Sequence, residues 1–327
     1  MSHALYPFTF QPIFKDRVWG GRKLEQLYGK TLPPGVPIGE SWEITDRPEG
    51  VSVIANGPLA GRDLRWLMEH HGKELLGDSQ PCAGRFPLLV KILDAQEKLS
   101  LQVHPPAHKA TELCGEPKTE MWYVADATPG ADLFVGLRRG ATHAEFERRI
   151  QDGSVAECFH RIQVKRGDSM FLPSGRVHAL GAGNVIFEIQ QNSDTTYRVF
   201  DWNRVGLDGK PRELHIPQAL ASIDFEDFEP ALATADWKSE GDHEARRLAA
   251  CELFVVDALR LPPGGEIGLG GNRVNVLAVT EGRLAVAWRN SDCELKPGDF
   301  CVVPAVCANS TTMRAAGNTT FLQAIAN

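Results

Sequence analysis

Residues 167–178 of the 327-residue chain read GDSMFLPSGRVH. Gly167 starts a turn before a short apolar strand, and Pro173 with Gly175 forms a tight bend after it. His178 begins the next strand, where its side chain can point into the interior of a β-barrel. The stretch therefore predicts two short strands joined by a bend, with a histidine on the inner face.

Short strands are expected on both sides of this stretch. In residues 99–104 apolar and polar side chains alternate, so Gln102 and His104 look into the same space. A capping box at Thr142 and apolar spacing elsewhere predict a few short helices, at residues 62–76, after Thr142 and within 213–222. Further strands are expected at residues 39–44, 86–93, 119–125, 132–137, 155–164, 169–172 and 185–190.

The C-terminal part of the chain repeats the pattern weakly. Residues 298–304 read GDFCVVP, which resembles GDSMFLP at 167–173, but no histidine follows at the place of His178. Strands are expected there at residues 251–261, 274–280, 283–288 and 299–303. The sequence thus predicts an N-terminal catalytic unit at 1–223, a linker or surface segment at 224–248, and a C-terminal β unit without metal ligands at 249–327.

Composition excludes several functional classes. A formal charge of -7 and a pI near 5.8 do not indicate a basic surface that would bind nucleic acid or an anionic membrane. No apolar run reaches the length of a membrane span, and the N-terminus lacks the pattern of a secretory signal. The seven cysteines are scattered and never form C-x-x-C, so we expect a protein of the reducing cytoplasm. The sequence predicts no oligomeric state.

Residues 167–178 also fit G-x5-P-x-G-x2-H over their whole length, the pattern of the second cupin motif. Cupins are double-sheet jelly rolls whose interior can hold a metal or a small ligand. The resemblance, together with the strand pattern, implies a mainly β fold of two cupin-like jelly-roll β-barrels with a few short helices.

Four side chains in this region could hold a metal ion. His104 and His178 offer imidazole nitrogen, Glu120 a carboxylate, and Gln102 a neutral carbonyl oxygen, a set that suits zinc and leaves positions for substrate oxygens. Iron and manganese accept similar donors. The alternative is that all four are ordinary polar residues on strand faces, and the complete motif ending at His178 favours the metal.

Three further runs carry a family resemblance. Residues 100–105 (SLQVHP), 118–122 (KTEMW) and 192–198 (NSDTTYR) are similar to the signatures of type I phosphomannose isomerases, especially the short bacterial form, and the likeness extends from about Pro12, through GESWE at 39–43, to the C-terminus. It implies interconversion of mannose 6-phosphate and fructose 6-phosphate through a cis-enediol, with one Zn²⁺ per chain. The implied metal ligands are Gln102, His104, Glu120 and His178, and the implied catalytic residues are Lys118, Asp194 and Arg198.

The implied chemistry needs a base beside a carbonyl and a group that stabilises the oxyanion. Arg198 stays protonated, so it would support the enediolate or the substrate phosphate. Lys118 or Asp194 could move the protons, and the sequence does not decide between them. The phosphate contacts stay unassigned. Side chains that could line the pocket are Glu40, Trp42, Glu43, Glu188 and Gln190.

Two other functions use the same residues. One is a cupin oxygenase with iron on these ligands, and the other is a non-catalytic, metal-containing module that binds sugar or regulates. Retention of Lys118, Asp194 and Arg198 together favours the isomerase over the non-catalytic module. The expected partner is a small sugar phosphate, with no nucleic acid and no membrane.

Overall fold

The computed structural model describes residues 4–289 and 291–327, in which strands predominate and the helices are short. The mainly β fold class is confirmed. Neighbouring strands form open antiparallel sheets that pack face to face, and no closed barrel is found among the described strands.

Two sheets are built from the N-terminal part of the chain. The first sheet contains, in spatial order, β1 (Ile13–Gly21), β2 (Ile38–Ile44), β5 (Leu88–Ala95), β12 (Asn184–Gln191), β7 (Glu120–Ala127) and β10 (Ser169–Leu172). The second contains β13 (Tyr197–Phe200), β6 (Leu101–Val103), β11 (His178–Leu180), β8 (Asp132–Leu137) and β9 (Phe159–Gln163).

Two more sheets are built from the C-terminal part. The third sheet contains β14 (Lys238–Glu240), β15 (His243–Ala250), β16 (Phe254–Leu261), β23 (Thr319–Ala326), β18 (Asn275–Glu281) and β21 (Phe300–Val303). The fourth contains β17 (Glu266–Gly268), β22 (Thr311–Ala315), β19 (Leu284–Trp288) and β20 (Ser291–Leu295). Strands β14 and β15 begin inside 224–248, the segment for which the sequence suggested a linker or surface stretch.

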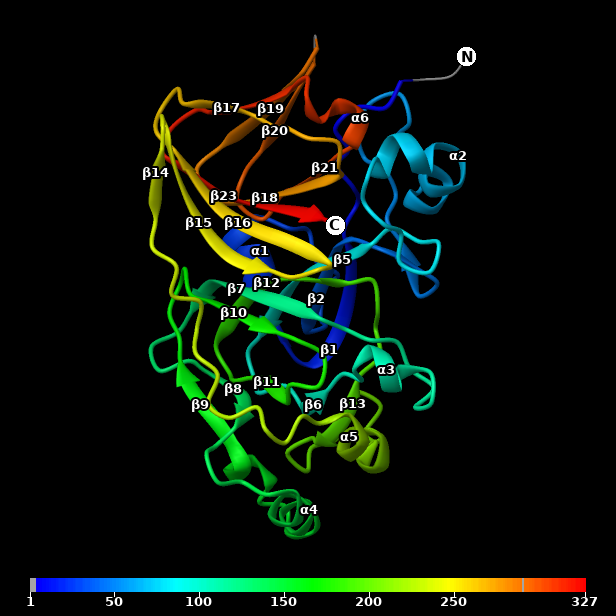
Figure 1. Cartoon of the computed structure of the whole chain (residues 1–327), viewed down its shortest axis with the longest axis vertical. Coiled ribbons are helices and arrows are strands. Elements are labelled where there is room, and N and C mark those ends of the chain that lie inside the picture. Colours follow the sequence, from blue (N-terminus) through cyan, green and yellow to red (C-terminus); the bar gives the residue numbers. More distant parts are fainter. Residues whose placement is uncertain (1–3, 290) are drawn as a thin grey trace.

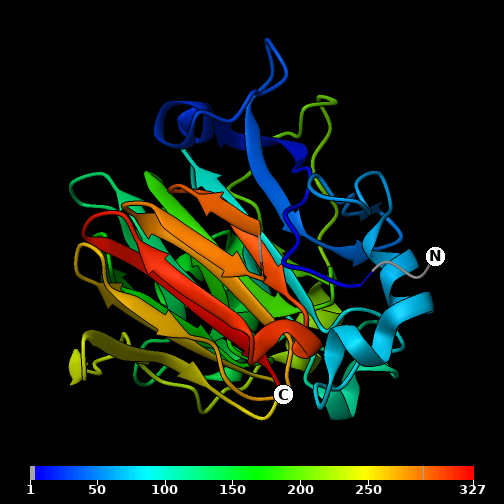
Figure 2. The same cartoon turned by 90° about the horizontal axis from the view of Figure 1, so that it is seen from above.

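The remaining elements lie around the sheets. A two-stranded ribbon pairs β3 (Asp46–Arg47) with β4 (Gly50–Val51). The helices are α1 (Lys23–Tyr28), α2 (Leu64–Leu76), α3 (Ala107–Ala110), α4 (His143–Asp152), α5 (Ile216–Ser222) and α6 (Ala305–Ala308), with a 3₁₀ turn η1 at Val155–Cys158. Viewed from above, α2 and α6 lie together at one edge of the molecule (Figure 2).

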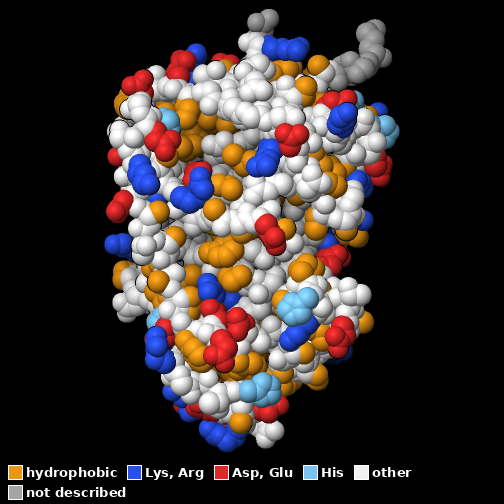
Figure 3. Space-filling view, viewed as in Figure 1, with side chains coloured by type: hydrophobic (Ala, Val, Ile, Leu, Met, Phe, Trp, Pro, Cys, Tyr) orange, Lys and Arg blue, Asp and Glu red, His pale blue; other side chains and the backbone are white. Residues whose placement is uncertain are grey.

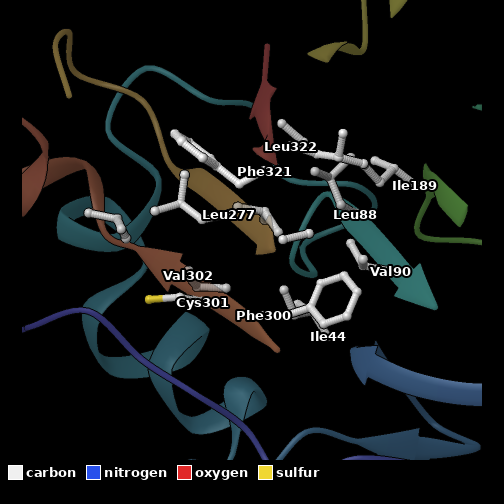
Figure 4. Close-up of a cluster of buried hydrophobic side chains, with 14 of the residues drawn as sticks. Ile44, Leu88, Val90, Ile189, Leu277, Phe300, Cys301, Val302, Phe321 and Leu322 are labelled. Atoms are coloured by element: carbon white, nitrogen blue, oxygen red, sulfur yellow. The ribbon is translucent and has the colours of Figure 1, made fainter. Parts of the chain in front are cut away.

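The four sheets stack as layers along the long axis, in the order fourth, third, first, second (Figure 1). Apolar side chains of the first and third sheets meet between these layers (Figure 4). The Phe187 and Phe300 rings, one from each sheet, lie with their centroids 5.2 Å apart. The backbone of Phe8 also pairs with Val302 on β21. The N-terminal and C-terminal parts therefore share one continuous core.

Strand β12 shows how this layering places polar groups. Val185, Phe187 and Ile189 point toward the third sheet and join the shared core, whereas Ile186 packs on the second sheet. Glu188, two residues beyond Ile186, lies on the same face because side chains alternate along a strand. Both faces of the first sheet are covered, which explains the nearly continuous apolar run at residues 86–93.

Candidate metal centre and active-site cavity

The four predicted metal-binding side chains converge between the first and second sheets. Gln102 on β6 lies directly opposite His178 on β11, Glu120 begins β7, and His104 follows β6. His178 Nε2 is 3.3 Å from Glu120 Oε1, and His104 Nε2 is 3.6 Å from Glu120 Oε2. One donor atom from each of these three residues lies within 4.8 Å of the other two.

Backbone carbonyls orient both imidazoles. His104 Nδ1 lies 2.7 Å from the carbonyl oxygen of Thr195, and His178 Nδ1 lies 2.9 Å from that of Arg176. A carbonyl can only accept a hydrogen bond, so each Nδ1 carries the proton and each Nε2 lone pair faces Glu120. Burial and the nearby Lys118 ammonium lower the pKa of His104 to about 3, and burial also lowers the pKa of His178. Both imidazoles are therefore neutral near pH 7, as metal ligation requires.

The carboxylate of Glu120 is fully buried, yet neither oxygen accepts a hydrogen bond from the residues that the structure describes. Lys118 Nζ forms an ion pair with Oε2 at 2.8 Å. Burial would raise the pKa of Glu120, but the positive charge of Lys118 outweighs it and holds the pKa well below its usual range. An ionised carboxylate with unused lone pairs beside two neutral imidazoles fits a divalent metal ion.

Gln102 can complete this set. Its Nε2 donates to His178 Nε2 at 3.3 Å, and its carbonyl oxygen accepts from Ser100 Oγ at 3.3 Å. The two ends of a glutamine amide have nearly the same shape, so a half-turn of the group points the oxygen toward the cluster instead.

A cavity of about 510 Å³ opens beside Gln102 and Lys118. Its walls come from β1, β2, β5, β6 with the residues before it, β12, the start of β13 and the loop at 206–212. Six of the predicted residues line it, namely Glu40, Gln102, Lys118, Glu188, Asp194 and Arg198.

The other predicted lining residues lie elsewhere. Trp42 is buried next to the cavity and its Nε1–H donates to Glu40 Oε2 at 2.7 Å. Glu43 points to the opposite side of β2, where Lys30 lies 2.8 Å from Oε1. Gln190 is buried and its amide donates to the carbonyl of Ser193 at 2.5 Å.

Lys91 is a lining residue that the sequence reasoning missed. Its ammonium lies 3.4 Å from carboxylate oxygens of Glu188 and Asp194 and 3.8 Å from one of Glu40. It is the charged residue in the otherwise apolar run LLVKIL of β5. A buried lysine needs charged partners, so this interruption was a usable signal.

Three arginines line the cavity as well, Arg17, Arg198 and Arg212, and only Arg198 was predicted. Arg17 Nε donates to Glu40 at 2.7 Å, and Arg212 forms two hydrogen bonds of 2.6 and 2.7 Å with Asp201. Arg198 Nε has no hydrogen-bond partner in the described chain. Burial and the positive charge of Arg212 lower the pKa of Arg198, which nevertheless stays protonated at neutral pH.

Comparison of the sequence with known proteins identifies its family. The family described as "Phosphomannose isomerase type I, catalytic domain" matches residues 8–131. The mannose-6-phosphate isomerase ManA of Bacillus subtilis is 36% identical over 304 residues, covering 91% of this chain and 93% of its own. The chain belongs to the type I phosphomannose isomerase family. A mannose-6-phosphate isomerase of Streptococcus mutans is 37% identical over 91% of this chain and 92% of its own.

Solved structures agree with the family assignment. The crystal structure of the Bacillus subtilis mannose 6-phosphate isomerase superposes with a TM-score of 0.88 at 31% identity, covering 98% of this chain and 99% of that one. A zinc-bound mannose 6-phosphate isomerase has the same fold, with a TM-score of 0.76 at 18% identity, over 99% of this chain and 100% of that one.

Among the residues that the structure describes, every helix is too short or too polar to cross a membrane. On the face shown in Figure 3, basic and acidic side chains are interspersed, without a large basic patch.

Proposed function

We propose that the protein interconverts mannose 6-phosphate and fructose 6-phosphate with one zinc ion held by Gln102, His104, Glu120 and His178. The observation that carries the proposal is the buried cluster of His104, Glu120 and His178, which lies beside a cavity lined by Lys118, Asp194 and Arg198. Family membership supports the same reaction.

Zinc bound by these residues would supply Lewis-acid chemistry that polarises the sugar carbonyl. The protein's own groups supply the rest. Lys118 lies beside the ligands, with Nζ 3.4 Å from His104 Nε2, so its ammonium can hydrogen-bond a substrate oxygen as negative charge develops there. Arg198, which has spare donors in the cavity, can support the enediolate in the same way.

Three cavity groups can exchange a proton with a bound sugar. Lys118 and Asp194 are the two that the sequence suggests. The structure adds Glu188, whose carboxylate lies 3.4 Å from Lys91 and 3.9 Å from Lys118. Burial raises the pKa of Glu188 against the opposing influence of the two lysines. A carboxyl whose pKa moves toward neutrality is well suited to proton transfer at physiological pH.

The substrate phosphate is assigned to the arginines of the cavity. Arg17, Arg198 and Arg212 interact electrostatically, and planar guanidinium groups with free N–H donors bind phosphate oxygens in pairs. Asp201 and Glu40 neutralise part of this charge, which allows three cations to gather without a ligand. The sugar would then extend from the arginines to the metal ligands.

A coupled assay with mannose 6-phosphate tests the function. The zinc-loaded protein should turn over, lose activity in a chelator and regain it with zinc, whereas Arg198→Ala should keep the metal and lose most of kcat. Absence of turnover in the loaded protein, or turnover that survives metal removal, would refute the proposal. Oxygen uptake by the iron-loaded protein would instead indicate a cupin oxygenase. Sugar binding without turnover would indicate a non-catalytic module.

A further inference from the structure

Arg47 lies outside the cavity lining, on the ribbon β3–β4, and is only 9% exposed. Its Nη1 donates to Glu116 Oε2 at 2.6 Å and to the backbone carbonyl of Asn192 at 3.0 Å. These partners belong to two separate segments, each of which leads directly into the site. Residues 116–120 carry Lys118 and Glu120, and residues 192–198 carry Asp194 and Arg198.

The same two segments are bonded to each other and to a metal-binding residue. Glu116 N–H donates to Thr195 Oγ1 at 3.0 Å, and Ser193 Oγ donates to the Glu116 carbonyl at 3.3 Å. The Thr195 carbonyl then accepts the Nδ1–H of His104 at 2.7 Å. A displacement of residues 192–195 would therefore move the group that orients the imidazole.

The start of the 192–195 segment is fixed by buried hydrogen bonds. Asn192 is 2% exposed, and its amide donates to the carbonyls of Phe86 at 2.8 Å and Asp46 at 3.2 Å. Its own carbonyl accepts from Arg47, with the Cys82 thiol a weak second donor at 4.0 Å. Removing the guanidinium would leave a buried carbonyl nearly unpaired, which favours a shifted backbone.

We infer that Arg47 is a positioning residue: by bonding the Asn192 carbonyl and Glu116, it holds the Thr195 carbonyl against His104 and keeps Asp194 at the cavity wall. The effect on turnover rests on the proposed reaction, whereas the effect on metal affinity rests only on the proposed metal site. Outer partners of metal-bound histidines typically contribute about 10- to 100-fold to metal affinity or activity.

The test compares Arg47→Met with Arg65→Met in the full chain. Arg65 is the matched control. It lies on α2, and its Nη1 is 3.1 Å from Oδ2 of Asp46, a residue of the ribbon β3–β4. Its other polar partners are Glu69 and the carbonyl of Gly84, so it contacts neither of the two segments that lead into the site. Zinc affinity is measured by competition with a chromophoric chelator, and ligand geometry by the visible spectrum of the cobalt-substituted protein. Arg47→Met should weaken zinc binding roughly 10-fold or more, alter the cobalt spectrum and lower kcat at saturating zinc with little change in KM. Arg65→Met should keep wild-type zinc affinity and spectrum.

Unchanged zinc affinity and an unchanged cobalt spectrum in Arg47→Met would overturn the inference. If Arg47→Met fails to fold, Arg47→Gln takes its place, since its amide is uncharged and its nitrogen ends two bonds short of Nη1, the atom that makes both contacts, and wild-type affinity in that variant would equally overturn the inference. If the wild-type protein binds zinc without isomerase activity, the proposed function fails while the metal readouts still decide the role of Arg47.

Discussion

At the scale of single residues, the charged side chains of the cavity lie beside side chains of opposite charge. Lys91 meets three carboxylates, and Arg17 and Arg212 each hold one acid while facing the cavity. Because Lys91, Glu40 and Glu188 are buried, the interactions of these three groups are stronger than those of surface pairs. Changes to one charged residue should therefore have effects that depend on its partners.

Arg212→Ala should mainly weaken recognition of the phosphate. Loss of charge-assisted hydrogen bonds predicts a KM for mannose 6-phosphate raised about 10- to 100-fold, with a smaller change in kcat. Inhibition by inorganic phosphate should weaken in parallel. Arg204→Ala is the control, since Arg204 also pairs with Asp201 but does not line the cavity. Equal effects of the two variants would show that Arg212 acts only through the loop structure.

The carboxylate of Glu40 should make the free energy of unfolding fall at acid pH. Burial alone would raise its pKa, but Lys91, Arg17 and the Trp42 hydrogen bond lower it from 4.5 to about 2. The ionised form is thus favoured in the folded state, and this stabilisation is complete above pH 4.5 and is lost as pH falls toward 2. Such a shift corresponds to about 3 kcal/mol.

Urea unfolding between pH 3 and 6 measures this contribution. Glu40→Gln should flatten the fall in unfolding free energy below pH 4.5, while Glu25→Gln, which alters an exposed pair with Arg22, should follow the wild type. Parallel curves for wild type and Glu40→Gln would contradict the prediction.

The sequence could indicate those site residues that belong to compact motifs. Gln102 and His104 followed from strand alternation, and Lys118 and Asp194 from the family signatures. Arg17 and Arg212 could not be found this way, because each reaches the cavity through contacts between segments far apart in the chain. The unpredicted cations are thus products of the packing of the first sheet against the loop at 206–212.

At the scale of elements, local signals were reliable where a cap or alternation was present. Helix α2 runs over Leu64–Leu76, close to the expected 62–76, because Asp63 accepts a hydrogen bond from Trp66 N–H. Residues 155–158 were expected to extend a strand, which was wrong. They form the turn η1, in which Val155 and Cys158 are three residues apart and pack together into the apolar cluster outside the second sheet. That packing has the period of a 3₁₀ helix and overrides the β-propensity of valine.

Helix α4 provides a test of capping. Thr142 Oγ1 accepts from Glu145 N–H at 3.1 Å, as predicted, but the Glu145 side chain bonds Arg138 and Arg149 instead of completing the capping box. Thr142→Ala should therefore lower the unfolding free energy by about 1 kcal/mol without affecting turnover, because α4 is remote from the cavity. Thr142→Ser should retain stability, and a loss of activity in Thr142→Ala would contradict the remoteness of α4.

At the scale of the whole molecule, the third sheet packs directly on the sheet that carries Glu40, Lys91, Glu120 and Glu188. One apolar cluster contains buried residues of both proposed units, 1–223 and 249–327, and the weak repeat at 298–304 belongs to the second unit. The repeat predicted the strand β21 but could not predict which face of it meets the N-terminal part. Phe300 and Cys301 are neighbours on β21 and therefore point to opposite faces of the strand. The face that carries Phe300 is the one that meets Phe187 of the first sheet.

Phe300→Ala should show whether the two parts unfold together. Phe300 is buried against Phe187, and removing a buried phenyl ring costs about 3–5 kcal/mol. Because the lost contacts lie between the first and third sheets, both parts should be destabilised and the chain should still unfold in one transition. Denaturant curves followed by tryptophan fluorescence and by loss of catalytic activity should shift together. Two separated transitions, with activity lost only in the second, would instead mean that the catalytic part is stable without the C-terminal sheets.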